Sequence, residues 1–255
     1  MKTERGAVNP PPSRSTPGEL TARAKLAELF RDCPIPDAEI LYNLSLFVSR
    51  QAFARYLLMN ELYKKIVDVQ GIIIEFGCRW GQNLALLQTL RGIYEPFNFQ
   101  RKILGFDTFA GFPSVSQKDG SKALVAEGNF SVTLGYEKYL EQVLACQEQE
   151  SPISQIRKFE VIKGDAPVEL RKYLQANPQT IIAFAYFDFD LYEPTKKCLE
   201  LIKDHLTKGS ILGFDELNCP TFPGETAALK EVFGLDRYRI KRSPLAPYPS
   251  YLEID

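Results

Sequence analysis

Carboxylate residues recur at one kind of place in this sequence, shortly after short apolar runs. Asp107, Asp165 and Asp188 each follow such a run, and Asp215 and Glu216 follow another. In an open α/β sheet the carboxyl ends of the strands meet at one edge, where ligands bind. A single aspartate at a strand end is an ordinary turn or helix-cap residue. Carboxylates after four runs indicate a ligand site.

Asp188, Asp215 and Glu216 have the residue types and positions of a divalent metal site. Three carboxylates from neighbouring strand ends repel one another unless a cation lies among them. Magnesium prefers oxygen ligands and keeps several waters. Such an ion would hold a substrate hydroxyl and lower its pKa, and Asp188 is the candidate catalytic base. Asp190 shares a strand face with Asp188, and we expect it to cap the following helix.

A glycine-containing turn follows the first apolar run, residues 72–76. Gly77 permits a tight turn, and Gly81 lets the next helix start close beneath a ligand. The spacing is not the GxGxxG of a dinucleotide site, which argues against a nicotinamide dehydrogenase. The Lys-Ser/Thr pair of a P-loop is absent as well.

Five apolar runs predict the strands that position these residues: 72–76, 103–106, 159–162, 181–187 and 210–214. Helical patterns separate them, at 82–94, 136–149, 167–175 and 194–206. Continuous apolar strands that alternate with helices predict an α/β fold with a mostly parallel sheet and helices on both faces. Two late strands, at 238–240 and 250–254, would close one edge.

The chain divides into three predicted regions. Residues 1–17 are rich in proline and small polar residues and predict a flexible arm. Residues 18–70 predict a helical extension of three helices, and residues 71–255 the main domain. Each helix of the extension has an apolar face that needs a partner. That partner is the main sheet, another subunit in a homo-oligomer, or the substrate, and the sequence leaves these alternatives open.

The composition excludes several classes of protein. With 31 basic and 32 acidic residues the chain has no basic excess, so we expect no nucleic-acid partner. The five cysteines form no CxxC pair and predict neither a zinc site nor a disulfide framework. No signal peptide and no apolar run of ~20 residues is present, which predicts a cytoplasmic protein with no membrane partner. The single histidine, His205, is expected at the surface, away from the ligand edge.

Taken in order, these motifs resemble the macrocin O-methyltransferase family. The resemblance runs from about Gly71 to Phe233, through the ExGxxxG turn, GFDTFAGFP at 105–113, KGD at 163–165 and FDFDLYEPT at 187–195. It implies a Rossmann-like class I methyltransferase fold, S-adenosylmethionine and Mg²⁺ as cofactors, and methylation of sugar hydroxyls in natural products. Glu216 departs from the usual Asp or Asn. The histidine base of some relatives has no counterpart here.

The resemblance also implies roles for single residues. Glu75 would lie near the ammonium of the cofactor's methionine half. Asp107 would accept hydrogen bonds from the ribose hydroxyls, and Asp165 would face the exocyclic amine of adenine. The complete cofactor-binding set is Glu75, Gly77, Gly81, Asp107, Thr108 and Asp165.

These inferences predict an O-methyltransferase acting on a small hydroxylated molecule, such as a sugar. N- or carboxyl-methylation on the same scaffold is one alternative, and a catalytically silent binding protein is another. The polar stretch 113–135 is a substrate lid or a disordered loop. Residues 220–226 line the acceptor pocket or only begin a helix.

Overall fold

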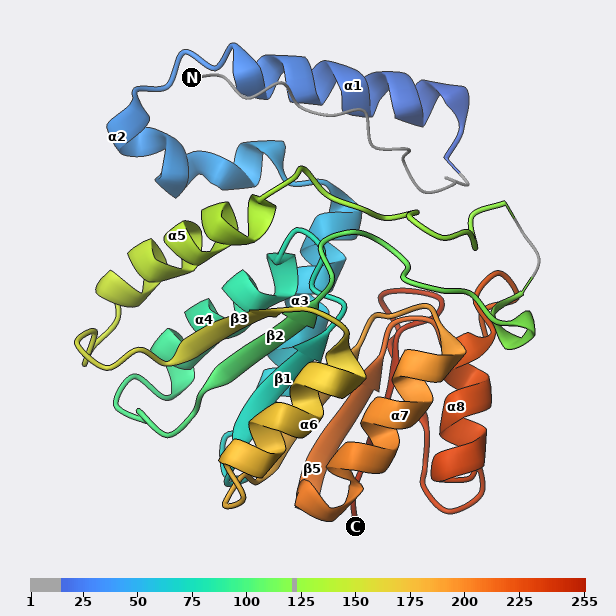
Figure 1. Cartoon of the computed structure of the whole chain (residues 1–255). Helices are drawn as coiled ribbons and strands as arrows, with labels where there is room; N and C mark the ends of the chain where they lie inside the picture. Colours follow the sequence, from blue (N-terminus) through green and yellow to red (C-terminus); the bar gives the residue numbers. More distant parts are fainter. Residues whose placement is uncertain (1–14, 121–122) are drawn as a thin grey trace.

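A seven-stranded sheet runs through the described residues, 15–120 and 123–255 of the computed structural model (Figure 1). The strand order is β3-β2-β1-β4-β5-β7-β6. The first five of these strands pair in parallel, and β7 pairs antiparallel with β5 and β6. The predicted mostly parallel sheet is therefore confirmed. The strands are β1 Ile72–Phe76, β2 Ile103–Asp107, β3 Phe159–Lys163, β4 Ile182–Phe187, β5 Leu206–Phe214, β6 Lys241–Arg242 and β7 Ser250–Glu253.

Helices cover both faces of the sheet, as predicted. Buried side chains of α3, α4 and α5 form one apolar core with the sheet, and those of α6, α7 and α8 form the other. Every residue of β1 and β4 is buried, because each strand has helices on both sides. The helices of the main domain are α4 Gln82–Tyr94, α5 Tyr136–Gln149, α6 Ala166–Ala176, α7 Tyr192–Ile202 and α8 Gly224–Val232.

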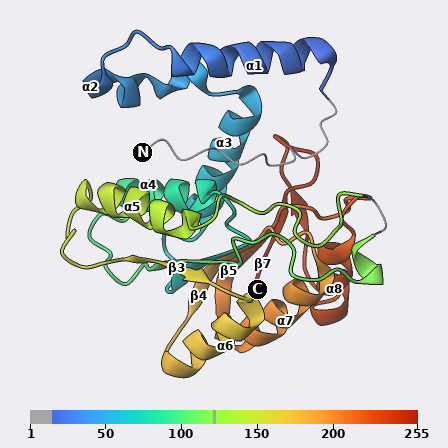
Figure 2. The ribbon, with the colours of Figure 1, turned by 45° about the horizontal axis from the view of Figure 1, so that its top comes forward.

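The N-terminal extension consists of an outlying part and a packed part. Figure 2 shows α1 (Pro17–Arg31) and α2 (Asp37–Ile40) on the outside of the molecule, with α3 (Arg50–Lys65) leading down to the sheet. Neither α1 nor α2 has a buried residue, whereas α3 buries four. Thr16 caps α1 through a reciprocal bond with Glu19, so this helix begins at the end of the predicted 1–17 arm. Residues 1–14 lie outside the described residues.

Backbone register aligns the carboxyl ends of the central strands. Phe106 pairs with Phe76, Phe76 with Phe187, and Phe187 with Phe214, which forms a row of four buried rings across the sheet. Neighbouring ring centroids along the row are 4.8–5.5 Å apart. The next residue on each strand therefore lies in a second row at the rim of the sheet. That row is Asp107, Gly77, Asp188 and Asp215.

Three details differ from the sequence-based expectation. The helix predicted to continue through Phe47 becomes a 3₁₀ helix from Leu41. The strand predicted at 238–240 was wrong, because the short edge strand is Lys241–Arg242. The helix predicted to reach residue 206 ends at Ile202, and His205 follows in a 3₁₀ turn at the opposite edge from the aspartate row. None of the helices among the described residues is both long and apolar enough to span a bilayer.

Candidate active site

Two adjoining cavities open at the carboxyl ends of the central strands. The larger has a volume of about 630 Å³ and the smaller of about 60 Å³. Gly77 and Asp188 line both cavities, so the two are parts of one site. Of the predicted residues, the larger cavity is lined by Glu75, Asp188, Asp215 and Glu216, and the smaller by Asp107, Thr108 and Asp165. We call Glu75, Gly77 and Asp107 the glycine-turn side, and Asp188, Asp190, Asp215 and Glu216 the acidic side.

Gly77 and Gly81 both adopt the left-handed conformation that the predicted turn requires, with φ of 85° and 75°. A Cβ at Gly77 would lie 2.0 Å from the carbonyl oxygen of Asp188, so the β1 turn and the β4 turn touch here through their backbones. A Cβ at Gly81 would clash with Leu140 of α5. Gly81 lines neither cavity and acts by letting α4 start close to α5.

Asp107 is held by the backbone of the two turns beside it. Its carboxylate accepts hydrogen bonds from Arg79 N at 2.7 Å and from Phe109 N at 2.5 Å. Burial raises the pKa of Asp107, and these two N–H groups oppose the shift. Thr108 is used within the same turn, because its hydroxyl donates to Gly111 O and accepts from Ala110 N.

Glu75 is a buried carboxylate with one free oxygen. Its Oε1 accepts a hydrogen bond from Asn83 Nδ2 at 2.9 Å, and its Oε2 is buried without a partner. Burial raises the pKa of Glu75 to about 8. An unpartnered buried carboxylate oxygen at a cavity wall fits a ligand that carries a positive charge or an N–H group.

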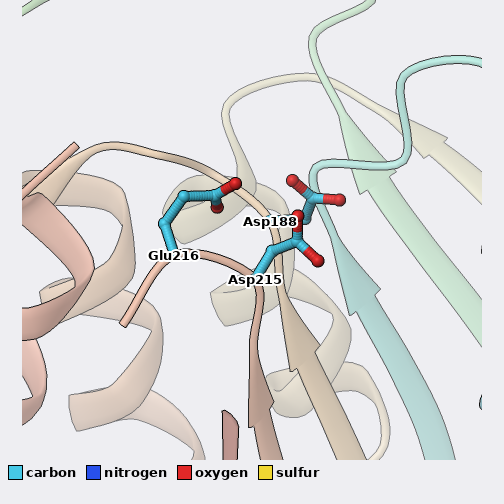
Figure 3. Close-up of side chains that lie close together, drawn as sticks. All are labelled: Asp188, Asp215 and Glu216. Atoms are coloured by element: carbon cyan, nitrogen blue, oxygen red, sulfur yellow. The ribbon is translucent and has the colours of Figure 1, made fainter. Parts of the chain in front are cut away.

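The three predicted metal ligands converge. One oxygen of each carboxylate lies within 4.8 Å of the other two, and Figure 3 shows the three side chains at the ends of β4 and β5. Glu216 Oε2 is buried and has no partner. Burial and the charge of Asp215 raise the pKa values of Asp188 and Glu216 well above their ordinary range. This set of oxygen donors fits a hard divalent cation.

The sequence analysis missed the basic partner of this cluster, Arg55 on α3. Its guanidinium pairs with both carboxylate oxygens of Asp215, and Arg55 Nη2 lies 2.9 Å from Asp215 Oδ2. Tyr186 on β4 also donates its hydroxyl to Asp215. Burial acts to raise the pKa of Asp215, but the Arg55 charge and these hydrogen bonds hold it below its ordinary value. The N-terminal extension therefore contributes a side chain to the site.

The predicted capping role of Asp190 was wrong. Helix α7 has no side-chain cap of its own, and Tyr192 N instead donates to the buried carboxylate of Asp119, which is 73 residues away. Asp190 has a left-handed backbone (φ 62°) and lines the larger cavity together with Asp188, Asp215 and Glu216. Burial, together with the charge of Asp215, raises the pKa of Asp190 to about 7. Asp190 thus belongs to the acidic side.

Three aromatic side chains line the larger cavity together with the carboxylates. They are Phe112, Phe130 and Phe222, and rings of adjacent members of this set lie 5.0 and 6.1 Å apart. Phe130 comes from the 113–135 stretch, and Phe222 from the 220–226 segment. The buried Asp119 ties the first of these segments to α7. A cavity lined by both apolar and polar side chains suits a small ligand that has one polar and one apolar face.

The chain is similar over nearly its whole length to CalS11, a calicheamicin methyltransferase. The two are 43% identical, with a TM-score of 0.92 and 94% of each chain covered. The apo structure of CalS11, a TDP-rhamnose 3'-O-methyltransferase of calicheamicin biosynthesis, matches at 40% identity and a TM-score of 0.84, over 94% of this chain and 96% of that one.

A more distant likeness extends to the O-methyltransferase NovP, which is 16% identical. The TM-score is 0.58, and 79% of each chain is covered, which supports the fold alone. No family model matches the chain, and no curated protein matches it.

Proposed function

Since the chain belongs to the S-adenosylmethionine-dependent O-methyltransferases, we propose that its acceptor is a hydroxyl of a nucleotide-linked sugar in natural-product biosynthesis. The observation that carries the proposal is the 43% identity to CalS11 over 94% of both chains. CalS11 acts on TDP-rhamnose. The resemblance of the motifs to the macrocin O-methyltransferase family favours a sugar hydroxyl as the acceptor, without requiring a nucleotide.

The proposal assigns the glycine-turn side to S-adenosylmethionine. Glu75 would bind the ammonium group, because its Oε2 is buried without a partner. Asp107 would accept hydrogen bonds from the ribose hydroxyls, and Asp165, across the smaller cavity, would face the adenine amine. Gly77, Gly81 and Thr108 would shape the turns around the cofactor.

The acidic side is proposed to hold Mg²⁺ through Asp188, Asp215 and Glu216. The convergence of the three carboxylates and the unpartnered Glu216 Oε2 support this assignment. The ion would supply Lewis acidity toward the acceptor hydroxyl. Asp188 would receive the hydroxyl proton, since its carboxylate lines the larger cavity beside the proposed ion. Arg55 would hold Asp215 in the ionised form.

Incubation with S-adenosylmethionine and TDP-rhamnose tests the proposal directly. We expect a product heavier by one methylene group, whose methyl is located on a sugar oxygen by NMR. Formation of the product should depend on Mg²⁺ and stop with a chelator. A product methylated on nitrogen or on a carboxylate, formed equally well with chelator, would favour the alternative reactions. Failure to bind S-adenosylhomocysteine in titration calorimetry would favour a catalytically silent binding protein.

We also propose that copies of this chain associate through the N-terminal extension. The 3₁₀ helix Leu41–Phe47, which follows α2, exposes large apolar side chains, among them Leu41, Tyr42 and Leu46, which are 72%, 89% and 61% exposed. Exposed apolar groups of this kind are typical of association surfaces. Light scattering should show an oligomer, and Leu46→Glu together with Tyr42→Glu should reduce it to a monomer. A monomeric parent protein would refute this part of the proposal.

A further inference from the structure

Glu225 is a buried carboxylate with no basic side chain bonded to it. It lies in the first turn of α8, has 0% exposure and contacts the backbone of two other segments. Its Oε1 accepts hydrogen bonds from Phe189 N at 3.1 Å and Asp190 N at 3.3 Å. Its Oε2 accepts one from Glu216 N at 3.1 Å. One side chain thus joins the turn after β4 to the turn after β5.

These two turns carry all the carboxylates of the acidic side. Backbone hydrogen bonds still hold Asp188 N to Phe76 O and Asp215 N to Phe187 O, at 2.8 and 2.9 Å. The residues that Glu225 contacts lie beyond these bonds and belong to no helix or strand. Asp190 also has a left-handed backbone, which for a residue with a side chain persists only when the surroundings hold it. Glu225 supplies that hold, because it bonds the Asp190 N–H directly.

The chemistry of the contact requires a carboxylate. Three N–H donors converge on two oxygens, and an amide side chain has only one acceptor oxygen. Burial and the charge of Asp190 raise the pKa of Glu225, while its hydrogen bonds from the two turns oppose the shift. Adding a buried carboxylate to an already acidic site is unfavourable for folding alone. A role in the site accounts for its position better than a role in the core.

We propose that Glu225 is a positioning residue that holds Glu216 in place beside Asp188 and Asp215, whose own positions the strand ladder fixes. It lines neither cavity and acts through the carboxylates beside it. The inference rests on the proposed function of those three carboxylates. The start of α8 also packs closely against the end of the turn after β4, where α7 begins. A Cβ at Gly224 would lie 2.5 Å from Tyr192 N.

The test compares Glu225→Gln with a matched control, Thr226→Val. Thr226 is the next residue on α8, and its hydroxyl accepts a single backbone hydrogen bond, from Asn218 N at 2.9 Å, outside the acidic side. We expect Glu225→Gln to lower kcat by about 10- to 100-fold, because small misplacements of catalytic groups cost this much. Mg²⁺ affinity, measured by calorimetry, should fall about tenfold. Affinity for S-adenosylhomocysteine should stay within about twofold, and Thr226→Val should resemble the parent in all three readouts.

Each outcome decides the inference. If Glu225→Gln keeps the kcat and Mg²⁺ affinity of the parent, Glu225 does not hold Glu216 in place. If cofactor affinity falls as much as kcat, its role is general folding and the inference fails. Should Glu225→Gln not fold, Glu225→Asp keeps the charge but shortens the reach, and the same loss of kcat with unchanged cofactor affinity is expected. If the parent binds S-adenosylhomocysteine but not Mg²⁺, the metal assignment is refuted. In that case the effect of Glu225→Gln on kcat alone decides the inference.

Discussion

The glycine-turn side and the acidic side of the site are held in place by different means. Asp107 takes its hydrogen bonds from backbone N–H groups 28 and 2 residues away, at the ends of neighbouring strands. Asp215 takes its hydrogen bonds from the side chains of Arg55 and Tyr186, which are 160 and 29 residues away. Backbone N–H groups hold Asp107, whereas side chains hold Asp215, one of them from α3 in the N-terminal extension.

This difference separates binding from chemistry. A carboxylate held by backbone N–H groups of two adjoining strand-end turns depends on the sheet for its position. A carboxylate held by a helix from outside the main domain depends on how that helix is packed. We therefore expect changes on the glycine-turn side to alter cofactor affinity, and changes on the acidic side or in its supports to alter turnover.

The largest expected effect is that of Asp188→Asn. Removing the proposed base and metal ligand should lower kcat by about 10³-fold, while affinity for S-adenosylhomocysteine changes by less than about threefold. Steady-state kinetics and calorimetry measure the two quantities. Asp190→Asn, in the same turn, should have a smaller effect on kcat. A kcat for Asp188→Asn close to that of the parent would remove the distinction between the two sides.

Asp107→Ala should lower cofactor affinity more than kcat, the reverse of Asp188→Asn. Loss of a charged hydrogen-bond partner costs about 1.5–3 kcal/mol, which corresponds to an affinity for S-adenosylhomocysteine about 10- to 100-fold weaker. The kcat at saturating cofactor should fall less than the affinity. Asp165→Asn, which changes another residue that lines the smaller cavity, should lower cofactor affinity less than Asp107→Ala does. Unchanged cofactor affinity in Asp107→Ala would show that the glycine-turn side is assigned wrongly.

Arg55→Gln tests the remote support of the acidic side. Breaking a buried ion pair costs about 3 kcal/mol of stability, and the freed Asp215 should lower kcat by about tenfold. Cofactor affinity should remain within about twofold. Arg50→Gln, at an exposed position on the same helix, is the control and should match the parent. Equal losses in cofactor affinity and kcat would mean that Arg55 supports the whole site and not one side of it.

The smallest effect concerns the pH dependence of stability. Burial raises the pKa of Glu75 from 4.5 to about 8, so between these values the folded protein keeps a proton that the unfolded chain has lost. The free energy of unfolding therefore falls as the pH rises through this window. We expect Glu75 alone to contribute about 5 °C to the fall in the Tm of the ligand-free protein between about pH 6 and pH 8. The drop in Tm should be smaller in Glu75→Gln. If Tm depends on pH in the same way in the variant and in the parent, the pKa of Glu75 is not raised.

The contrast between support from the backbone and support from side chains also explains which parts of the site the sequence predicts. Asp107, Asp188 and Asp215 follow apolar runs whose strand character is local, and parallel pairing then places all three at one rim. The support of Asp215 depends on tertiary packing, which the strand pattern does not contain. Even so, Arg55 carried a signal, since it lies three and four residues before Leu58 and Met59, which are buried. A charged residue on the apolar face of a helix needs a buried partner.

Glu225 and Asp190 carried no such signal. An acidic residue in the first turn of a helix is common for electrostatic reasons alone, so the sequence gives no reason to expect Glu225 in the site. Asp190 precedes a helix and therefore resembles a cap. The cap contact is instead made by Asp119, from a segment 73 residues away, which no local pattern indicates.

The backbone contact between Gly77 and Asp188 makes the two sides of the site thermodynamically linked. With only 2.0 Å between the Asp188 carbonyl and the point where a Cβ would stand, neither turn can shift toward the other without a clash. A ligand that orders one turn therefore restricts the other. Linkage is reciprocal, so the factor by which Mg²⁺ changes cofactor affinity must equal the factor by which the cofactor changes Mg²⁺ affinity. On the proposed assignment of Mg²⁺ to the acidic side, the concentration of each ligand would therefore affect the occupancy of the other.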